Sequence, residues 1–125
     1  MPLVALPKEN MMTDIEAIRI EMLNEADNAA NALYAKYGSD QMGACGFAWV
    51  TIVPKHKGNT RDGKTERKVL KELGFSKDWT GKSYQFWDPA RYGGQNIDIK
   101  EAGAVAGANV LKKYGFNAYA GSRLD

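Results

Sequence analysis

Apolar residues recur at steps of three and four over residues 14–37, and this pattern predicts a long amphipathic helix. The apolar positions are Ile15, Ile18, Met22, Ala26, Ala29, Leu33 and Tyr37. Thr13 and Glu16 have the spacing of a capping box, in which the Thr13 side chain accepts a hydrogen bond from the Glu16 amide. Gly38 is expected to end the helix, because glycine adopts the left-handed conformation at little cost.

A different pattern follows, in which short apolar runs alternate with polar segments. Residues 46–53 are uncharged, aromatic and β-branched, and they predict a strand that Pro54 ends. Neither face of this strand is clearly polar, so we expect it to be central and covered on both sides. The polar residues 55–64 are expected to form a loop, and residues 65–73 a short helix that stops at Gly74.

The last third of the chain predicts a strand, a helix and a strand. Residues 83–87 alternate and form the second expected strand, which Asp88-Pro89 ends. A helix is expected over 98–114, with Asp98 as its N-cap, and a final strand over 117–121. This helix has a row of small residues, Ala102, Gly103, Ala106 and Gly107. We interpret the row as a surface for close packing against the sheet or another helix.

The order of these elements predicts an α+β domain of two layers, with about three helices packed on a small sheet of about three strands. A length of 125 residues suits one domain, which we place at 13–125 after a flexible N-terminal arm at 1–12. Residues 69–75 (VLKELGF) resemble residues 110–116 (VLKKYGF). We interpret both as amphipathic helices with the same glycine stop, and an internal duplication is the alternative.

Composition excludes several classes of protein. No apolar run approaches ~18 residues, so we expect no transmembrane helix and no membrane partner. The only cysteine is Cys45, so no intrachain disulfide is possible, and we expect a cytoplasmic protein, in the host cytoplasm if a phage encodes it. No metal-spaced histidine and cysteine set, paired carboxylates or Ser-His-Asp arrangement is present. We therefore predict no metal site, no cofactor and no catalytic residue, and a non-enzymatic role is favoured.

Charge and aromatic residues together indicate a binding surface. Residues 55–82 carry nine basic and four acidic side chains, whereas residues 1–43 carry three basic and seven acidic ones. Such a concentration of positive charge suits an anionic partner, and nearby aromatic rings suit unstacked bases. Trp79 lies in a polar turn and is the ring expected to be exposed. The predicted nucleic-acid or phosphate-binding residues are Lys55, Lys57, Asn59, Thr60, Arg61, Lys64, Arg67 and Trp79.

Residues 58–65 match the phosphate-binding pattern G-x-x-x-x-G-K-T. The wider context of a nucleotide hydrolase is missing, since no apolar strand ends in an acid that could help to hold magnesium. We therefore expect no ATP hydrolysis, while an enzyme acting on a phosphate ester through this loop remains an alternative function. A factor that binds a protein and modulates a host enzyme is the other alternative.

Three short segments resemble a known group of proteins. They are residues 57–60 (KGNT), 100–103 (KEAG) and 121–125 (GSRLD). Through these segments the chain resembles small uncharacterised proteins encoded by bacteriophages and prophages. The resemblance extends over about residues 44–125. The resemblance implies a viral origin and no particular reaction or catalytic residue.

Overall fold

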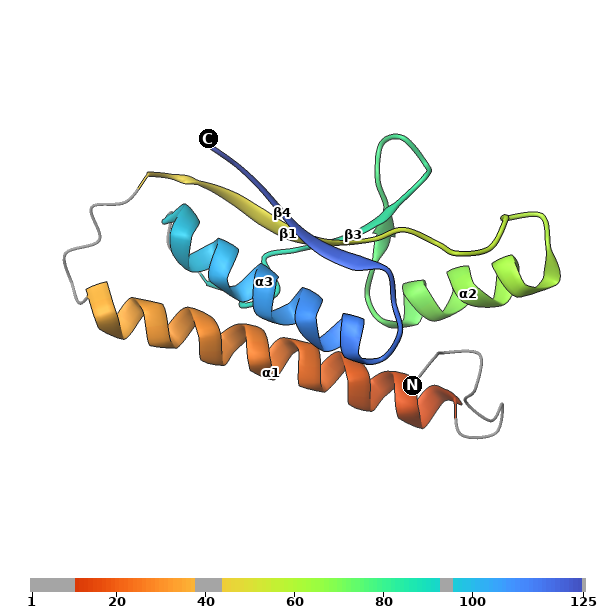
Figure 1. Ribbon diagram of the computed structural model, residues 1–125, viewed down its shortest axis with the longest axis horizontal. Coiled ribbons are helices and arrows are strands. Elements are labelled where there is room, and N and C mark those ends of the chain that lie inside the picture. Colours follow the sequence, from red (N-terminus) through yellow and green to blue (C-terminus); the bar gives the residue numbers. More distant parts are fainter. Residues whose placement is uncertain (1–10, 38–43, 93–95, 125) are drawn as a thin grey trace.

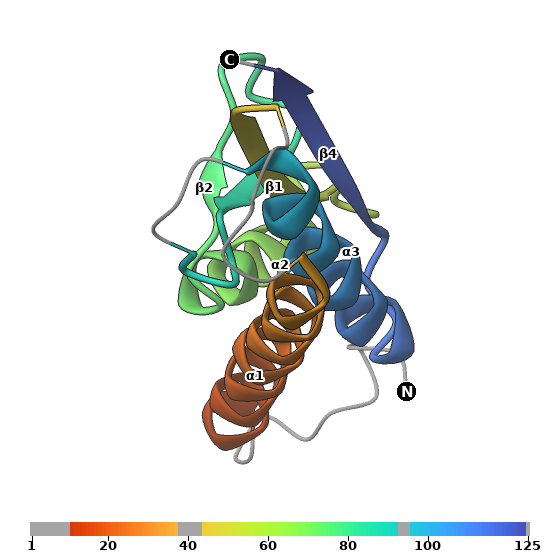
Figure 2. The ribbon, with the colours of Figure 1, turned by 90° about the vertical axis from the view of Figure 1, so that its left-hand side faces the viewer.

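The computed structural model describes residues 11–37, 44–92 and 96–124. The order of elements is α1 (Met11–Tyr37), β1 (Gly46–Ile52), α2 (Arg61–Glu72), β2 (Ser76–Lys77), β3 (Tyr84–Trp87), α3 (Ile97–Lys113) and β4 (Ala118–Leu124). The strands form one antiparallel sheet in the order β2-β3-β1-β4, and the three helices lie on one side of it (Figures 1 and 2). The predicted α+β class is confirmed, with four strands where about three were expected.

The connections after α1 interleave two βαβ units. β3 is antiparallel to both β1 and β2, so β1 and β2 run in the same direction with β3 between them. Likewise β3 and β4 run in the same direction with β1 between them. This β-α-β-β-α-β connectivity is the split βαβ, or ferredoxin-like, arrangement.

The two similar segments of sequence occupy equivalent places in these units. α2 and α3 end at Gly74 and Gly115, whose φ angles are 97° and 95°. After each glycine a phenylalanine amide bonds back to the helix, Phe75 to the Leu70 carbonyl at 3.0 Å and Phe116 to the Leu111 carbonyl at 3.1 Å. The predicted common helix stop is confirmed, and it turns the chain toward the sheet in the same way after α2 and after α3.

The core lies between the sheet and the helices α2 and α3, and α1 packs on α3 (Figure 2). The small-residue row of α3 makes this close packing possible. A Cβ atom at Gly103 would lie 2.7 Å from the Ala90 Cβ and 3.4 Å from the Ala26 carbonyl oxygen. The predicted packing role of this row is confirmed, but α1 packs mainly on α3, which corrects the expectation that all three helices lie on the sheet.

Three helix starts differ from the sequence prediction. α1 begins at Met11, so Thr13 lies inside the helix and is not its N-cap. α2 begins four residues before the expected start at 65, with Thr60 as N-cap. α3 is capped by Asn96, whose side chain accepts from the amides of Asp98 and Ile99, so Asp98 is not the cap.

Two further expectations concern membranes and the ends of helices. Within the described residues, no helix has the length and apolar character needed to cross a membrane. Residues 1–10 of the expected arm, and Gly38 as the expected end of the first helix, lie outside the described residues.

Candidate functional site

The phosphate-binding pattern at residues 58–65 is occupied by the chain's own backbone. The Thr60 hydroxyl donates to the Lys57 carbonyl at 2.6 Å and accepts from the Gly63 amide at 3.0 Å. A Cβ atom at Gly63 would lie only 1.8 Å from the Lys57 carbonyl oxygen. The second glycine of the pattern therefore allows close backbone packing at the start of α2, and it does not line a phosphate cradle.

Glu66 and Arg67 fix the loop that precedes α2. The buried Glu66 carboxylate accepts hydrogen bonds from the amides of Lys55 at 2.8 Å and His56 at 3.0 Å. Arg67 donates through Nη1 to the His56 carbonyl at 2.9 Å and the Gly63 carbonyl at 3.0 Å. A carboxylate of the chain thus already occupies these amides, and the Arg67 guanidinium, predicted as a phosphate contact, holds the loop together.

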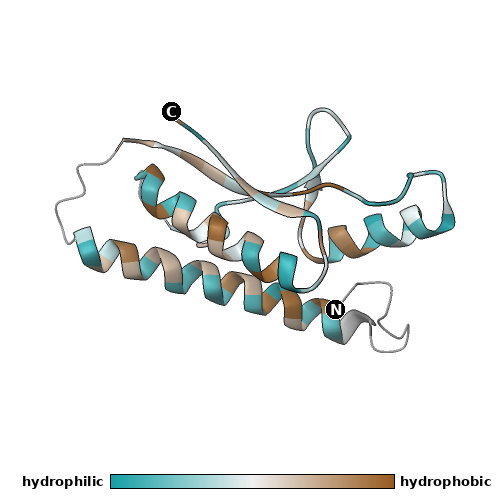
Figure 3. Cartoon of the chain, in the orientation of Figure 1, coloured by the Kyte–Doolittle hydropathy of each residue, from teal (hydrophilic) through white to brown (hydrophobic). Residues whose placement is uncertain are grey.

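The other predicted basic residues lie on the surface at the start of α2. The Lys55 ammonium donates to the Gly115 carbonyl at the end of α3. Lys57, Asn59, Arg61 and Lys64 are exposed, and the segment that leads into α2 is hydrophilic (Figure 3). This end of the molecule therefore offers positive charge to a partner.

Trp79 is 95% exposed, which confirms the prediction that its ring faces solvent. It lies in a turn built on Asp78, whose carboxylate accepts from the Thr80 amide at 3.1 Å, the Thr80 hydroxyl at 2.7 Å and the Gly81 amide at 3.0 Å. These bonds, the Thr80 side chain first, lower the pKa of Asp78. The loop between β2 and β3 rises on the side of the sheet away from the helices (Figures 1 and 2).

The outer face of the sheet, meaning the face away from the helices, is aromatic. Strand register places on it Phe47, Trp49 and Thr51 of β1, Gln85 and Trp87 of β3, and Tyr119, Gly121 and Arg123 of β4. These residues include one cation and no carboxylate. Helices cover only the other face of β1, which corrects the expectation that both of its faces are covered by other elements.

Four of these residues form a cluster that we call the aromatic cluster, comprising Phe47, Trp49, Trp87 and Arg123. The two indoles are stacked, with centroids 4.6 Å apart and planes inclined by 27°. The Phe47 ring meets Trp87 edge-on at 6.0 Å, and the Arg123 guanidinium lies 5.4 Å from the Phe47 centroid and 5.9 Å from that of Trp87. Trp87 remains 46% exposed, so the stack has a surface that a ligand can reach.

The backbone of β4 supports this stack from below. A Cβ atom at Gly121 would lie 2.6 Å from Nε1 of Trp49, so the indole rests directly on the glycine. On the other side of the cluster, Lys100 reaches from α3 and donates to the Gly46 carbonyl at 3.0 Å, with its ammonium 5.3 Å from the Phe47 centroid. Lys100 is itself buried, so its charge strengthens the cationic character of the cluster from within the fold.

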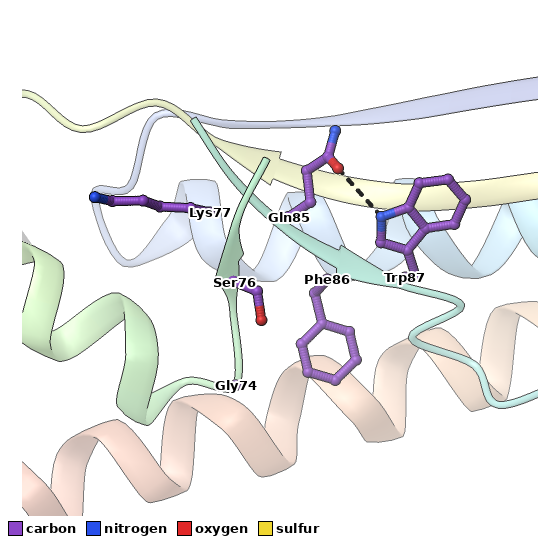
Figure 4. A pocket seen from close by; sticks show the side chains of 6 residues that line it. All are labelled: Gly74, Ser76, Lys77, Gln85, Phe86 and Trp87. Atoms are coloured by element: carbon purple, nitrogen blue, oxygen red, sulfur yellow. Dashed lines mark hydrogen bonds between the residues drawn. The ribbon is translucent and has the colours of Figure 1, made fainter. Parts of the chain in front are cut away.

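A depression of about 330 Å³ lies beside Trp87 (Figure 4). It is lined by Gly74, Ser76, Lys77, Gln85, Phe86 and Trp87. β2 pairs only with Tyr84 and Gln85, so Trp87 extends beyond the end of β2 and the depression opens there. The Trp87 indole donates from Nε1 to the Gln85 side-chain oxygen at 3.2 Å, which fixes the ring as one wall.

The chain after Trp87 is held in a strained turn. Asp88 and Arg91 have φ angles of 48° and 54°, which non-glycine residues adopt at a cost. Burial raises the pKa of Asp88, and the Arg91 guanidinium pairs with Asp27 of α1. Strain of this kind persists only where the surrounding structure determines it, and here it fixes the direction in which β3 ends.

A second depression suits an anionic ligand less well than the one beside Trp87. It measures about 480 Å³, lies between α1 and α3, and is lined by the acidic residues Asp98 and Glu101 together with Ala29, Leu33, Ala102, Val105, Ala106 and Asn109. Those carboxylates would repel a phosphate backbone. No group of three or more histidine, cysteine, aspartate or glutamate side chains that could hold a metal occurs within residues 11–37, 44–92 and 96–124.

The sequence contains one signal for the aromatic cluster, which is the alternation of large and small residues along β1. Phe47 and Trp49 alternate with the small Gly46 and Ala48, so large rings fall on one face of β1 and compact residues on the other. The predicted alternation in β3 is confirmed, since Tyr84 is buried and Trp87 is exposed.

Comparison of the chain with protein-family models, with curated proteins and with solved structures found no significant match.

Proposed function

We propose that this protein binds single-stranded nucleic acid on the outer face of its sheet. The observation that carries the proposal is the exposed Trp49–Trp87 stack with the Arg123 guanidinium beside it, among outward-facing strand residues that include no carboxylate. Bases stack on aromatic rings whatever their sequence, and arginine beside them neutralises phosphate. Some RNA-binding modules use a four-stranded sheet in this way and stack bases on its exposed aromatic residues.

The form of the face favours single strands over duplexes. In a duplex the bases are stacked on one another and a flat aromatic surface cannot reach their faces. The outward-facing strand residues offer stacked rings and one cation, Arg123, whereas duplex binding depends on rows of phosphate contacts. An extended strand with its bases turned toward Trp87 would match both features.

The exposed basic residues predicted from the sequence have a second role in this proposal. β1 has seven residues and is about 20 Å long. The aromatic cluster lies at its start, and the basic segment, meaning Lys57, Arg61 and Lys64, follows its end, so the two lie at opposite ends of the sheet. We expect a strand that lies along β1 to pass from the cluster toward Arg61 and Lys64. Trp79, on the loop beside this path, would contact a further base.

Titration of fluorescently labelled single-stranded DNA and RNA oligomers at two salt concentrations tests the proposal. Trp87→Ala is expected to weaken binding by roughly 5- to 150-fold, which corresponds to the loss of one stacked base of about 1–3 kcal/mol. Tyr37→Ala is the matched control, because Tyr37 is an exposed aromatic residue of α1 on the helical side. The Tyr37→Ala variant should bind the oligomer with the affinity of the wild type.

A different pattern of results would redirect the assignment. If Arg61→Ala with Lys64→Ala abolishes binding while Trp87→Ala leaves it unchanged, the basic end of α2 is the binding surface. If the wild type binds no oligomer at low salt, the proposal fails. The aromatic cluster then supports the second candidate, a protein interface, because tryptophan, tyrosine and arginine are enriched at the centres of such interfaces.

A further inference from the structure

The outer edge of β4 carries an inference that does not depend on the proposed function. β4 pairs with β1 over seven successive residues, Ala118 to Leu124, and among the described residues no strand pairs with its other edge. The opposite edge of the sheet is formed by β2, which has only two residues. The sheet therefore presents one long open edge.

Hydrogen bonding to β1 determines which groups of β4 point outward. The Val53 amide donates to the Asn117 carbonyl at 3.0 Å, which sets the phase of the antiparallel ladder. Paired residues alternate between bonded and non-bonded positions, so Tyr119, Gly121 and Arg123 bond to β1. The residues between them, Ala118, Ala120, Ser122 and Leu124, direct their amides and carbonyls away from the sheet.

This edge has few of the features that usually prevent strand addition. Proteins protect open edges with charged side chains, lysine above all, with proline, with bulges or with short strands. The charged side chain of β4, Arg123, is turned toward Phe47 and Trp87. β4 contains neither proline nor lysine, and its register with β1 is continuous, which excludes a bulge. Two of its apolar side chains are also well exposed, Tyr119 at 47% and Leu124 at 67%.

We infer that a second copy of this chain pairs antiparallel along β4. The strand is complementary to itself, because a two-fold axis at Gly121 sets Ala120 opposite Ser122 and Ala118 opposite Leu124 of the other copy. These are the residues whose backbone groups point outward, so the register satisfies them along the whole strand. No other register about a two-fold axis overlaps the full length of β4.

The side chains suit the same register. On the outer face, Tyr119 of each copy lies opposite Arg123 of the other, whose guanidinium lies over Phe47 and Trp87 of its own copy. The Tyr119 ring therefore packs beside the stem of the arginine as a cross-strand pair. On the helical side, the exposed Leu124 lies over the small Ala118 of the other copy. The two-fold axis is perpendicular to the sheet, so both aromatic clusters lie on one continuous face.

The test is the molecular mass of the full chain by analytical ultracentrifugation, from micromolar to millimolar concentration. We expect a dimer at the upper concentrations. Tyr119→Lys places a cation opposite Arg123 and should raise the dimer dissociation constant by about tenfold or more. The double variant Tyr119→Lys/Arg123→Glu restores opposite charges across the axis and should recover dimerisation. This recovery depends on the register and would not follow from a general effect on folding.

Amide hydrogen exchange provides a readout that needs no substitution. The amides of Ala118, Ala120, Ser122 and Leu124 should become slower to exchange as concentration rises, while the amides of Tyr119 and Gly121 are protected throughout. A monomer at millimolar concentration would overturn the inference. So would a dimer that is insensitive to Tyr119→Lys and shows no added protection along β4.

Discussion

Gly121 allows the aromatic cluster to be perturbed without touching the core. The substitution Gly121→Ala places a Cβ atom 2.6 Å from Nε1, 2.7 Å from Cε2 and 2.9 Å from Cζ2 of Trp49. Ordinary contacts of this kind measure 3.4–4 Å, so the indole must move outward by about 1 Å. Since Trp87 stacks on that indole at 4.6 Å, the movement displaces the exposed ring as well.

The cost of this substitution to the fold should be small. Trp49 is only partly buried and can move toward solvent, and replacing a strand glycine by alanine stabilises the strand by roughly 0.5–1 kcal/mol. We expect the free energy of unfolding in urea to change by no more than about 1 kcal/mol. Oligonucleotide affinity should fall by roughly 5- to 150-fold, as for the loss of one stacked base.

The assay combines fluorescence anisotropy of a labelled oligomer with urea unfolding followed by tryptophan emission. Ala120→Gly is the control, because it alters the next position of β4 on the helical face and leaves the indole in place. If Gly121→Ala shifts the tryptophan emission yet binds the oligomer as tightly as the wild type, the stacked indoles are not the binding surface. The reasoning from the geometry of the cluster would then be refuted.

Three further predictions concern stability, each measured by urea unfolding. Tyr84→Phe should be neutral or stabilising by about 1 kcal/mol, since the buried hydroxyl has no hydrogen-bond partner among the described residues, and a clear loss would contradict this. Gly63→Ala should destabilise by about 1–3 kcal/mol despite a better helix propensity, because the Cβ atom would meet a backbone carbonyl at 1.8 Å, whereas the exposed Lys64→Ala should be neutral. Asp88→Asn should stabilise the fold at neutral pH. Because burial raises the pKa of Asp88 in the folded state, ionisation of this carboxyl lowers the free energy of unfolding as the pH rises. The gain from asparagine should therefore vanish in acid, where the carboxyl is protonated.

Local signals in the sequence predicted most of the elements. The steps of three and four, the glycine stops at Gly74 and Gly115, and the break at Pro54 act through neighbouring residues, and a single sequence records them. The short β2 was missed because Ser76 and Lys77 carry no apolar pattern and become a strand only by pairing with β3. The start of α2 was misplaced because Gly63 has poor helix propensity, while the Thr60 side chain caps the helix by accepting from the Gly63 amide.

The candidate site was less predictable because it depends on which face of the sheet the helices cover. An aromatic strand such as β1 can lie between two layers or at an open surface, and alternation alone does not distinguish the two. The partner strands decide it, since Trp87 and Arg123 join Phe47 only through the registers of β3 and β4. The basic segment could be read from the sequence. The sequence did not show that Glu66 and Arg67 hydrogen-bond to the backbone of the loop before α2.

The interleaving of the two βαβ units has a consequence for how the protein opens. β3 lies between β1 and β2, and β1 lies between β3 and β4, so neither unit keeps its own strand neighbours if the other detaches. Partial opening that frees one unit alone would leave unpaired strands in both, and unfolding should therefore be cooperative across the sheet. A ligand on the outer face touches strands of both units, so its binding energy would add to the stability of the whole domain. Such binding should appear as a rise in melting temperature and as slower exchange of amides that are far from the ligand.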